Sequence, residues 1–255
     1  MERSPFSAKQ DYSLRWQRVH SIDGAKATEQ PTLPHREFLA LRAINAIGLI
    51  GSSQLTHLFL NGQKRVRVRM EKHGLILRHH LLVTGKQIDV YTLGKSGIDY
   101  LGEKARVTEN AWVMWPLASV LQRLEYWRLY TALKSHYKGL QMGASQSPFV
   151  GKISIRGQRM EILPIKNIQD TVTDHCDILA IKKPSLIVCE DIIEVYDLAP
   201  KLEGAPVRYV FEEDLDRRKT MPLTFYRYQQ GQWLSDQKDI LQHHKQQLIM
   251  LKQNT

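Results

Sequence analysis

Between residues 36 and 101 the spacing of the apolar side chains changes several times, and the order of these changes narrows the choice of fold. Helical spacing gives way to the alternation that is typical of strands, and then returns. The predicted elements are a helix at 36–46, an extended bridge at 49–50, a helix at 54–60, a basic helix at 63–73, strands at 75–83 and 87–93, and a helix at 95–101. This order is typical of a winged helix-turn-helix, in which a hairpin follows the third helix.

Positive charge is concentrated in the same part of the chain. The 255 residues include 36 Lys and Arg against 26 Asp and Glu, and residues 36–106 contain twelve of the bases and only five of the acids. Six cations and a single acid lie between Lys64 and Arg78. Such a local surplus creates a positive potential that attracts polyanions. The sequence therefore predicts double-stranded DNA as the partner.

The basic helix is predicted to enter the major groove, which accommodates a single α-helix. Arg65, Arg67 and Arg69 are expected to read base edges, because a guanidinium can bond guanine in a bidentate way. The lysines of this helix and of the hairpin tip are expected to contact phosphates. The residues expected at the DNA are Ser53, Gln63, Lys64, Arg65, Arg67, Arg69, Lys72, Arg78 and Lys86. An alternative is a winged helix that contacts another protein, with the cations on a solvated face.

A resemblance to the replication-relaxation family of plasmid and mobile-element proteins is carried by LALRAINAIGLIGSSQLTHLFLNGQKRVRVRMEKHGLILRH and, after it, VYTLGKSGIDYLG. Tyr91, Leu93 and Gly97 match the family's Y-x-L-T-x-x-G signature, whereas Gly94 stands where the family usually has a helix-capping Thr. The resemblance implies a DNA-binding protein of a plasmid, phage or other mobile element. Its role would be transcriptional regulation, or replication, maintenance or transfer of that DNA, alone or within a DNA-processing complex.

The rest of the chain predicts an α/β domain, so the expected fold class is α/β (α+β), an N-terminal winged helix plus a C-terminal α/β domain. The expected regions are a polar tail at 1–34, the winged helix at 35–102, the α/β domain at 111–232 and an amphipathic helix at 233–255. The elements expected in the third region are a helix at 117–137, strands at 151–155, 160–163, 176–181, 185–189 and 207–211, and a helix at 221–228.

The family's C-terminal half resembles a restriction-endonuclease-like core, and this implies a candidate catalytic site. The segments Cys176-Asp177-Ile178-Leu179 and Tyr209-Val-Phe-Glu-Glu-Asp214 match its acidic motifs. Asp177, Glu212 and Asp214 would hold Mg²⁺ in an active endonuclease, with the last two on one side of a strand. The expected Lys two residues after Glu212 is replaced by Asp214. We therefore expect a degenerate nuclease fold that serves as a scaffold, with no enzymatic activity, metal or other cofactor, and keep the Mg²⁺-dependent endonuclease as the alternative.

Further features concern location and assembly. The two cysteines cannot form a disulfide framework, no run approaches the roughly 18 apolar residues of a spanning helix, and the N-terminus lacks the apolar core of a secretory signal. A cytoplasmic protein without a membrane partner is expected. Apolar residues form one stripe along 235–251, which predicts a helix that either packs on its own domain or joins two copies as a homodimer.

Overall fold

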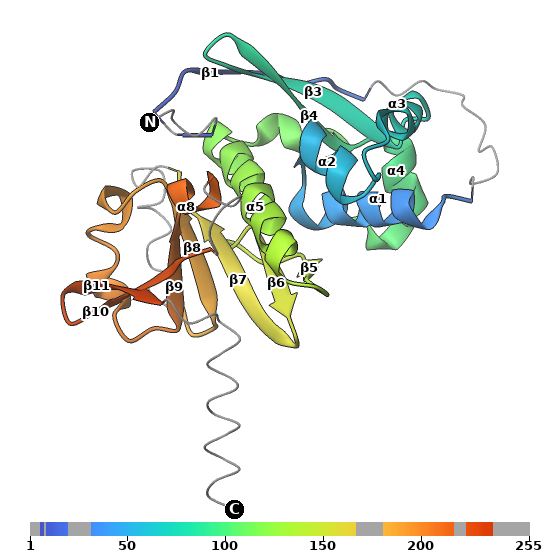
Figure 1. Ribbon diagram of the computed structural model, residues 1–255. Coiled ribbons are helices and arrows are strands. Elements are labelled where there is room, and N and C mark those ends of the chain that lie inside the picture. Colours follow the sequence, from blue (N-terminus) through green and yellow to red (C-terminus); the bar gives the residue numbers. More distant parts are fainter. Residues whose placement is uncertain (1–5, 8, 20–31, 167–180, 217–222, 237–255) are drawn as a thin grey trace, which may run out of the picture.

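The computed structural model describes residues 6–7, 9–19, 32–166, 181–216 and 223–236 (Figure 1). The chain is a mixed α/β structure with a four-stranded sheet, ordered β1-β3-β4-β2, and a seven-stranded sheet, ordered β11-β10-β9-β8-β7-β6-β5. Helix α5 (Leu117–His136) lies on the seven-stranded sheet, on the side that faces the first sheet (Figure 1). None of the helices in these residues combines the length and the apolar character needed to cross a bilayer.

The element order predicted for residues 36–101 is confirmed. The structure has α1 (His35–Ile47), β2 (Ile50–Gly51), α2 (Ser52–Leu58), α3 (Lys64–Lys72), β3 (Ile76–Val83), β4 (Lys86–Leu93) and α4 (Lys95–Leu101). Strands β3 and β4 are antiparallel and are joined by a two-residue turn, Thr84 and Gly85, with φ of 46° and 78°. Positive φ at both positions gives the backbone twist that suits a tight hairpin.

Close backbone contact explains why glycine stands at Gly94, where the resembling family has Thr. A Cβ atom on Gly94 would lie 2.2 Å from the carbonyl oxygen of Gly74, and one on Gly97 would lie 2.1 Å from that of Leu75. Both distances are far below van der Waals contact, so any larger residue forces the backbones apart. The first turn of α4 therefore lies directly on the chain segment that leaves α3.

The prediction of a polar tail at 1–34 is wrong for part of this region. Strand β1 (Tyr12–Arg15) pairs antiparallel with β3 and covers its outer edge. Next to it, the ring of Trp16 lies 4.8 Å from that of His79, and Nε1 of Trp112 donates to the carbonyl oxygen of Gln17 at 3.1 Å. The partners of β1 are distant in sequence, and the alternation of polar and apolar residues over its four positions is weak. The local sequence therefore carries no clear signal for a strand.

The second sheet has antiparallel flanks around a parallel centre. Strands β5 to β7 form an antiparallel meander, β7, β8 and β9 are parallel, and β10 and β11 add a second hairpin beside β9. The strands are β5 (Gln141–Gly143), β6 (Gly151–Ile155), β7 (Gln158–Pro164), β8 (Ser185–Cys189), β9 (Val207–Phe211), β10 (Phe225–Gln229) and β11 (Gln232–Asp236). Helix α8 (Glu212–Asp216) follows β9, and short 3-10 helices lie at Gly102–Lys104, Ala111–Met114, Ile193–Val195 and Pro200–Leu202.

Several C-terminal predictions need correction. Residues 225–228 of the helix predicted at 221–228 belong instead to strand β10. Residues 233–236, predicted as the start of the C-terminal helix, belong to strand β11. Glu212 starts a helix rather than continuing a strand. The remaining residues 221–222 and 237–255 of the predicted helices, and residues 176–180 of a predicted strand, lie outside the described residues.

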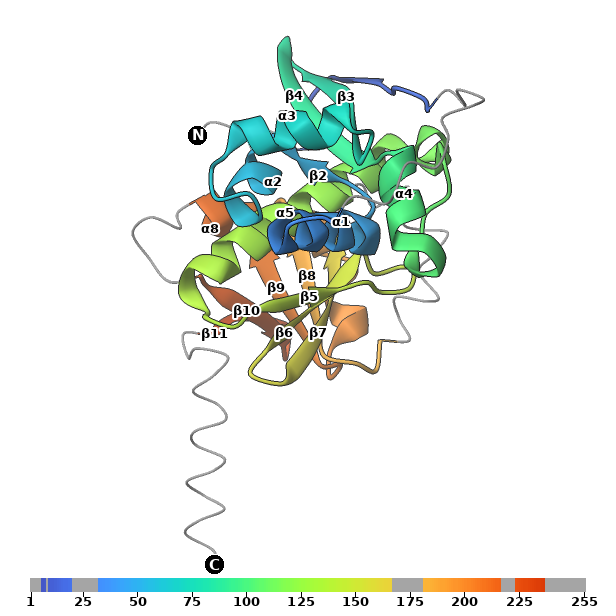
Figure 2. The same cartoon turned by 90° about the vertical axis from the view of Figure 1, so that its right-hand side faces the viewer.

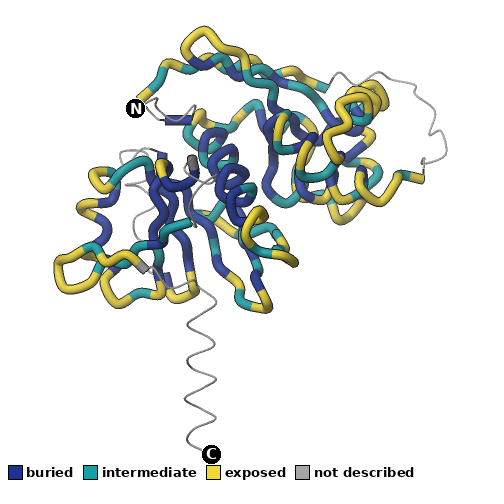
Figure 3. The backbone as a smooth tube through the Cα atoms, in the orientation of Figure 1, coloured by how far each residue is buried: buried dark blue, intermediate teal, exposed yellow. Residues whose placement is uncertain are grey.

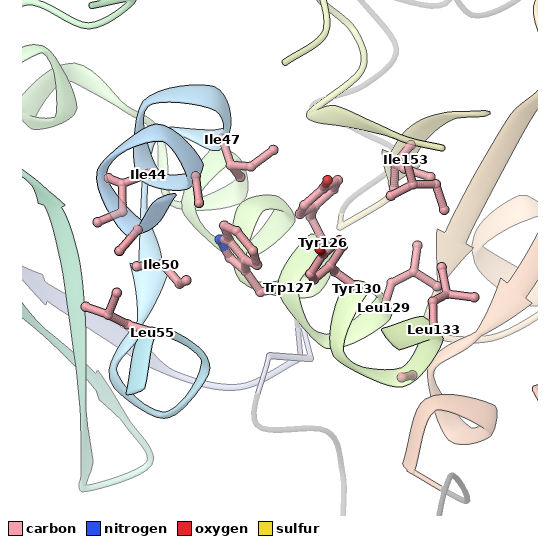
Figure 4. Close-up of a cluster of buried hydrophobic side chains, with 14 of the residues drawn as sticks. Ile44, Ile47, Ile50, Leu55, Tyr126, Trp127, Leu129, Tyr130, Leu133 and Ile153 are labelled. Atoms are coloured by element: carbon pink, nitrogen blue, oxygen red, sulfur yellow. The ribbon is translucent and has the colours of Figure 1, made fainter. Parts of the chain in front are cut away.

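One hydrophobic cluster connects both parts of the chain through α5 (Figure 4). Trp127 lies between Ile44 and Ile50 on one side and Ile153 of the second sheet on the other (Figure 4), and its Nε1 donates to the carbonyl oxygen of Leu49 at 2.6 Å. Burial is greatest along α5 and the central strands, whereas α3 and the tip of the β3–β4 hairpin are largely exposed (Figure 3). The surface of α3 is therefore held on a core that extends into the C-terminal sheet.

Candidate nucleic-acid interface

Helix α3 presents one basic face to solvent. Its exposed side chains are Lys64, Arg65, Val68, Arg69 and Lys72, at the spacing of a single helical face. Met70 on the opposite side is fully buried and anchors the helix. The turn of the β3–β4 hairpin lies at the end of β3 that is remote from α3 (Figure 1), and in the view of Figure 2 it stands above the helix. The helix and the hairpin tip are thus both accessible, but they are separate parts of the surface.

Arg67 differs from the arginines on either side, because its side chain points into the molecule. Its Nη1 donates to the hydroxyls of Ser52 and Thr56, the second at 3.1 Å. Its guanidinium carbon lies 5.5 Å from the ring centre of Tyr91. Position 67 is three residues before the buried Met70, and this spacing places both on the inner side of α3. Arg67 therefore fastens α3 to α2 and β4.

Two more predicted contact residues have acidic partners. Arg69 is 51% exposed and forms an ion pair with the buried Glu37 of α1. Arg78 on β3 donates from Nε to Glu71 Oε1 at 2.8 Å, and its Nη1 lies 4.0 Å from Asp89. Much of the charge of these two arginines is therefore balanced inside the protein.

The remaining cations on this surface carry uncompensated charge. Within the part of the chain that the structure describes, Lys64, Arg65, Lys72 and Lys86 are exposed and form no ion pair. Lys86 directly follows the hairpin turn. The predicted polar residues Ser53, in the first turn of α2, and Gln63, at the N-cap position of α3, are also exposed. The structure thus brings the predicted cations of α3 onto one helical face, whereas the hairpin turn before Lys86 lies at the opposite end of β3 (Figure 1).

His79 on β3 is fully buried and has a structural role. Its Nδ1 accepts the backbone N–H of Gln17 at 3.0 Å, and its Nε2 lies 2.8 Å from the hydroxyl of Thr92. Since Nδ1 is an acceptor, Nε2 carries the proton and donates to Thr92. Burial, followed by the charge of His80, lowers the pKa of His79 to about 3. The ring is therefore neutral and not accessible at the surface.

The acidic motif after β9 belongs to a buried cluster of alternating charges. Glu212 is 3% exposed, bonds to Nζ of Lys166 and accepts from Nη1 of Arg128 at 3.0 Å. Arg128 also binds both carboxylate oxygens of Glu125 at 2.9 Å, and Lys166 Nζ lies 3.3 Å from Glu125. Burial lowers the pKa of Lys166, but the carboxylates of Glu125 and Glu212 outweigh it, so the pKa is raised. The cluster joins α5, the end of β7 and α8.

The structure differs from the acidic site that the sequence predicts. Because α8 is a helix, Glu212 and Asp214 two positions apart do not face the same side, contrary to the strand expectation. Asp177 lies outside the described residues, and among those described no group of three or more His, Cys, Asp or Glu is placed to hold a metal ion. Sequence reasoning missed Glu125, Arg128 and Lys166; the available signal was the i, i+3 charge pair on an apolar helix.

No protein-family model, curated protein or solved structure matches this chain.

Proposed function

We propose that the chain binds double-stranded DNA through a winged helix-turn-helix formed by α1 to α4, with α3 in the major groove. The observation that carries the proposal is the outward face of α3, where Lys64, Arg65 and Lys72 have no acidic partner among the described residues. Exposed cations without acidic partners displace the counterions that are condensed on DNA phosphates, and the release of these counterions drives association. The hairpin adds Lys86 at its turn, at the other end of β3 from the helix.

The surroundings of each side chain suggest its role at the DNA. Arg65, near the start of α3, would contact base edges, because the N-terminal residues of a recognition helix reach furthest into the groove. Val68 is 54% exposed in the middle of this face, where an apolar group can contact a thymine methyl. Lys64, Lys72 and Lys86 would contact phosphates. Arg67 is not expected to contact the DNA, because its side chain holds α3 against α2 and β4.

The wider role rests on the sequence resemblance to the replication-relaxation family. We propose action on the DNA of a plasmid, phage or other mobile element in the cytoplasm, as a regulator of transcription or in replication, maintenance or transfer. The C-terminal sheet would act as the scaffold that supports the DNA-binding surface, a degenerate form of a nuclease-like core. Its Glu212 carboxylate is occupied by Lys166 and Arg128, an arrangement that favours structural use over Mg²⁺ binding.

The test is the affinity for duplex DNA of two variants that lose equal charge. One carries Lys64→Ala, Arg65→Ala and Lys72→Ala; the matched control carries Lys182→Ala, Lys183→Ala and Lys201→Ala, which are exposed on the C-terminal part. Fluorescence anisotropy with a labelled duplex should show a loss of at least about 10-fold for the first variant, since a single specific contact contributes roughly 1–3 kcal/mol. Equal affinities of the two variants would refute the assignment of α3.

A further inference from the structure

A hollow of about 1120 Å³ lies between α1, the end of α2 and strand β5, on the face of the molecule seen in Figure 2. It starts at Asn61, in the connection from α2 to α3, and reaches Lys104 and Arg106 after α4. Its floor comes from α5 through Tyr130 and from β5 through Met142. The hollow therefore adjoins the α3 surface but is made by other elements.

Basic side chains surround this hollow and no Asp or Glu lines it. Every one of these bases is exposed, and within the described residues none forms an ion pair. The basic residues are His35, Arg36, Arg42, Lys104, Arg106 and Lys134. A concave surface with one sign of charge concentrates the potential and attracts anions.

Aromatic rings and amides line the same space. The guanidinium carbon of Arg42 lies 5.8 Å from the ring centre of Phe38, and Nζ of Lys134 lies 5.8 Å from that of Phe59. Both rings are only half-buried. The amide side chains in the lining are Asn45, Asn61 and Gln141. Rings can stack on planar groups, and amides can both donate and accept hydrogen bonds.

The hollow continues past Asn45 and Arg106 into a second one of about 260 Å³, which shares both residues and also has no acidic lining. Here the guanidinium carbon of Arg123 lies 4.2 Å from the ring centre of Trp115. We call the two hollows together the basic trough. Cations interleaved with aromatic rings thus extend along a path rather than forming a single point site.

We propose that the basic trough binds a single strand of nucleic acid. An unpaired strand offers a phosphate backbone for the cations and exposed base faces for the rings, whereas a duplex keeps its base faces stacked inside. An acidic peptide would satisfy the cations and the amides but offers no planar base to stack on the aromatic rings. The chain's own segment 237–255 contains three Lys and one Asp, so its charge does not suit the trough. Because the trough starts next to α3, a protein holding a duplex there could also hold an adjacent unpaired strand.

The experiment compares binding of an oligothymidine of about 20 nucleotides with binding of a duplex, using the full chain. The first variant is Arg42→Glu with Lys104→Glu, and the matched control is Lys182→Glu with Lys183→Glu; all four residues are exposed. The trough variant should lose at least about 10-fold in affinity for the single strand, with a clearly smaller loss for the duplex, and the control should lose little for either.

A second variant, Phe59→Leu, separates stacking from charge. Base stacking on an aromatic ring is worth roughly 1–3 kcal/mol, so affinity for the single strand should fall about 5-fold or more, while affinity for polyglutamate should not change. Unaltered single-strand binding by the trough variant would overturn the proposal. So would polyglutamate that binds as tightly as the oligothymidine, which would identify an acidic peptide site. If the full chain binds the oligothymidine but not the duplex, the proposed role of α3 is refuted and the proposal for the basic trough stands.

Discussion

Arg65, Arg67 and Arg69 alternate in the sequence of one short helix, yet each has a different environment. Arg65 is exposed without an acidic partner among the described residues, Arg67 binds two hydroxyls of α2, and Arg69 pairs with the buried Glu37. Composition predicted a basic helix correctly, but it could not assign these roles, because they depend on what α1 and α2 place beneath α3. Of these three arginines, only Arg65 is both exposed and without an acidic partner among the described residues.

The buried cluster predicts a large loss of stability when one of its charges is removed. Lys166→Met leaves Glu125 and Glu212 with less compensation and should reduce the free energy of unfolding by about 3–5 kcal/mol. Adding Glu212→Gln removes part of the excess negative charge, so the double variant should lose less than the sum of the two single variants. Denaturant unfolding of the four proteins measures this coupling. Strictly additive losses would show that the cluster does not act as a unit.

His79 predicts a pH dependence of stability in the acidic range. Its pKa is about 3 in the folded chain and about 6.5 when unfolded, so as pH falls below about 6.5 the unfolded chain takes up the proton first. This contribution to stability is complete above about pH 6.5 and is lost at about 1.4 kcal/mol per pH unit down to about pH 3. The difference in unfolding free energy between wild type and His79→Gln should shrink accordingly. A constant difference from pH 7 to 4 would contradict the neutral, buried ring.

At the level of elements, the long periodic segments were predictable and the short ones were not. Helix α5 and strands β6, β8 and β9 match the predictions because apolar spacing over many residues, or a continuous apolar run, carries a strong signal. The sequence predicts a helix where the structure has strand β10. Gln230 and Gly231 after this strand both have positive φ, the geometry of a tight hairpin. The aromatic run Phe225-Tyr-Arg-Tyr before a Gly-containing turn was the signal.

Strand β1 predicts a defined effect of N-terminal truncation. A chain without residues 1–19 exposes the edge of β3 and uncovers the site of the buried Phe6. Burial of a Phe side chain alone contributes about 2 kcal/mol, and an uncovered strand edge promotes self-association. We expect a lower unfolding midpoint and larger species in sedimentation than for the full chain. Equal behaviour of the truncated and the full chain would show that β1 is dispensable.

At the level of the whole molecule, the N-terminal and C-terminal regions share their core. Trp127 and Tyr126 of α5 contact residues from α1 and β2 as well as β6. The sequence predicts one region that ends at 102 and another that begins at 111, and nothing in local spacing could reveal that packing crosses this boundary. For the same reason the basic trough was unpredictable, because it gathers residues from 35–61, 101–123 and 130–150. The charge surplus in 36–106 was predictable, and it contributes most of the cations of both surfaces.

Assembly is a separate prediction that rests on the apolar stripe along 235–251. If this segment joins two copies, the homodimer should read an inverted repeat with half-sites separated by whole turns of the duplex. Since β11 ends at Asp236, the proper comparison is between the full chain and one that ends there. Sedimentation equilibrium should give a dimer for the first and a monomer for the second. The same mass per particle for both chains would exclude dimerisation through this segment.

The salt dependence of duplex binding tests the central claim, that the outward face of α3 meets the DNA backbone. The logarithm of the association constant falls linearly with the logarithm of salt concentration, by about 0.9 for each phosphate contact. The variant Lys64→Ala with Lys72→Ala should therefore have a slope smaller by about 2 than wild type, and the control Lys182→Ala with Lys183→Ala should keep the wild-type slope. A slope that is the same for wild type and the α3 variant would contradict the account.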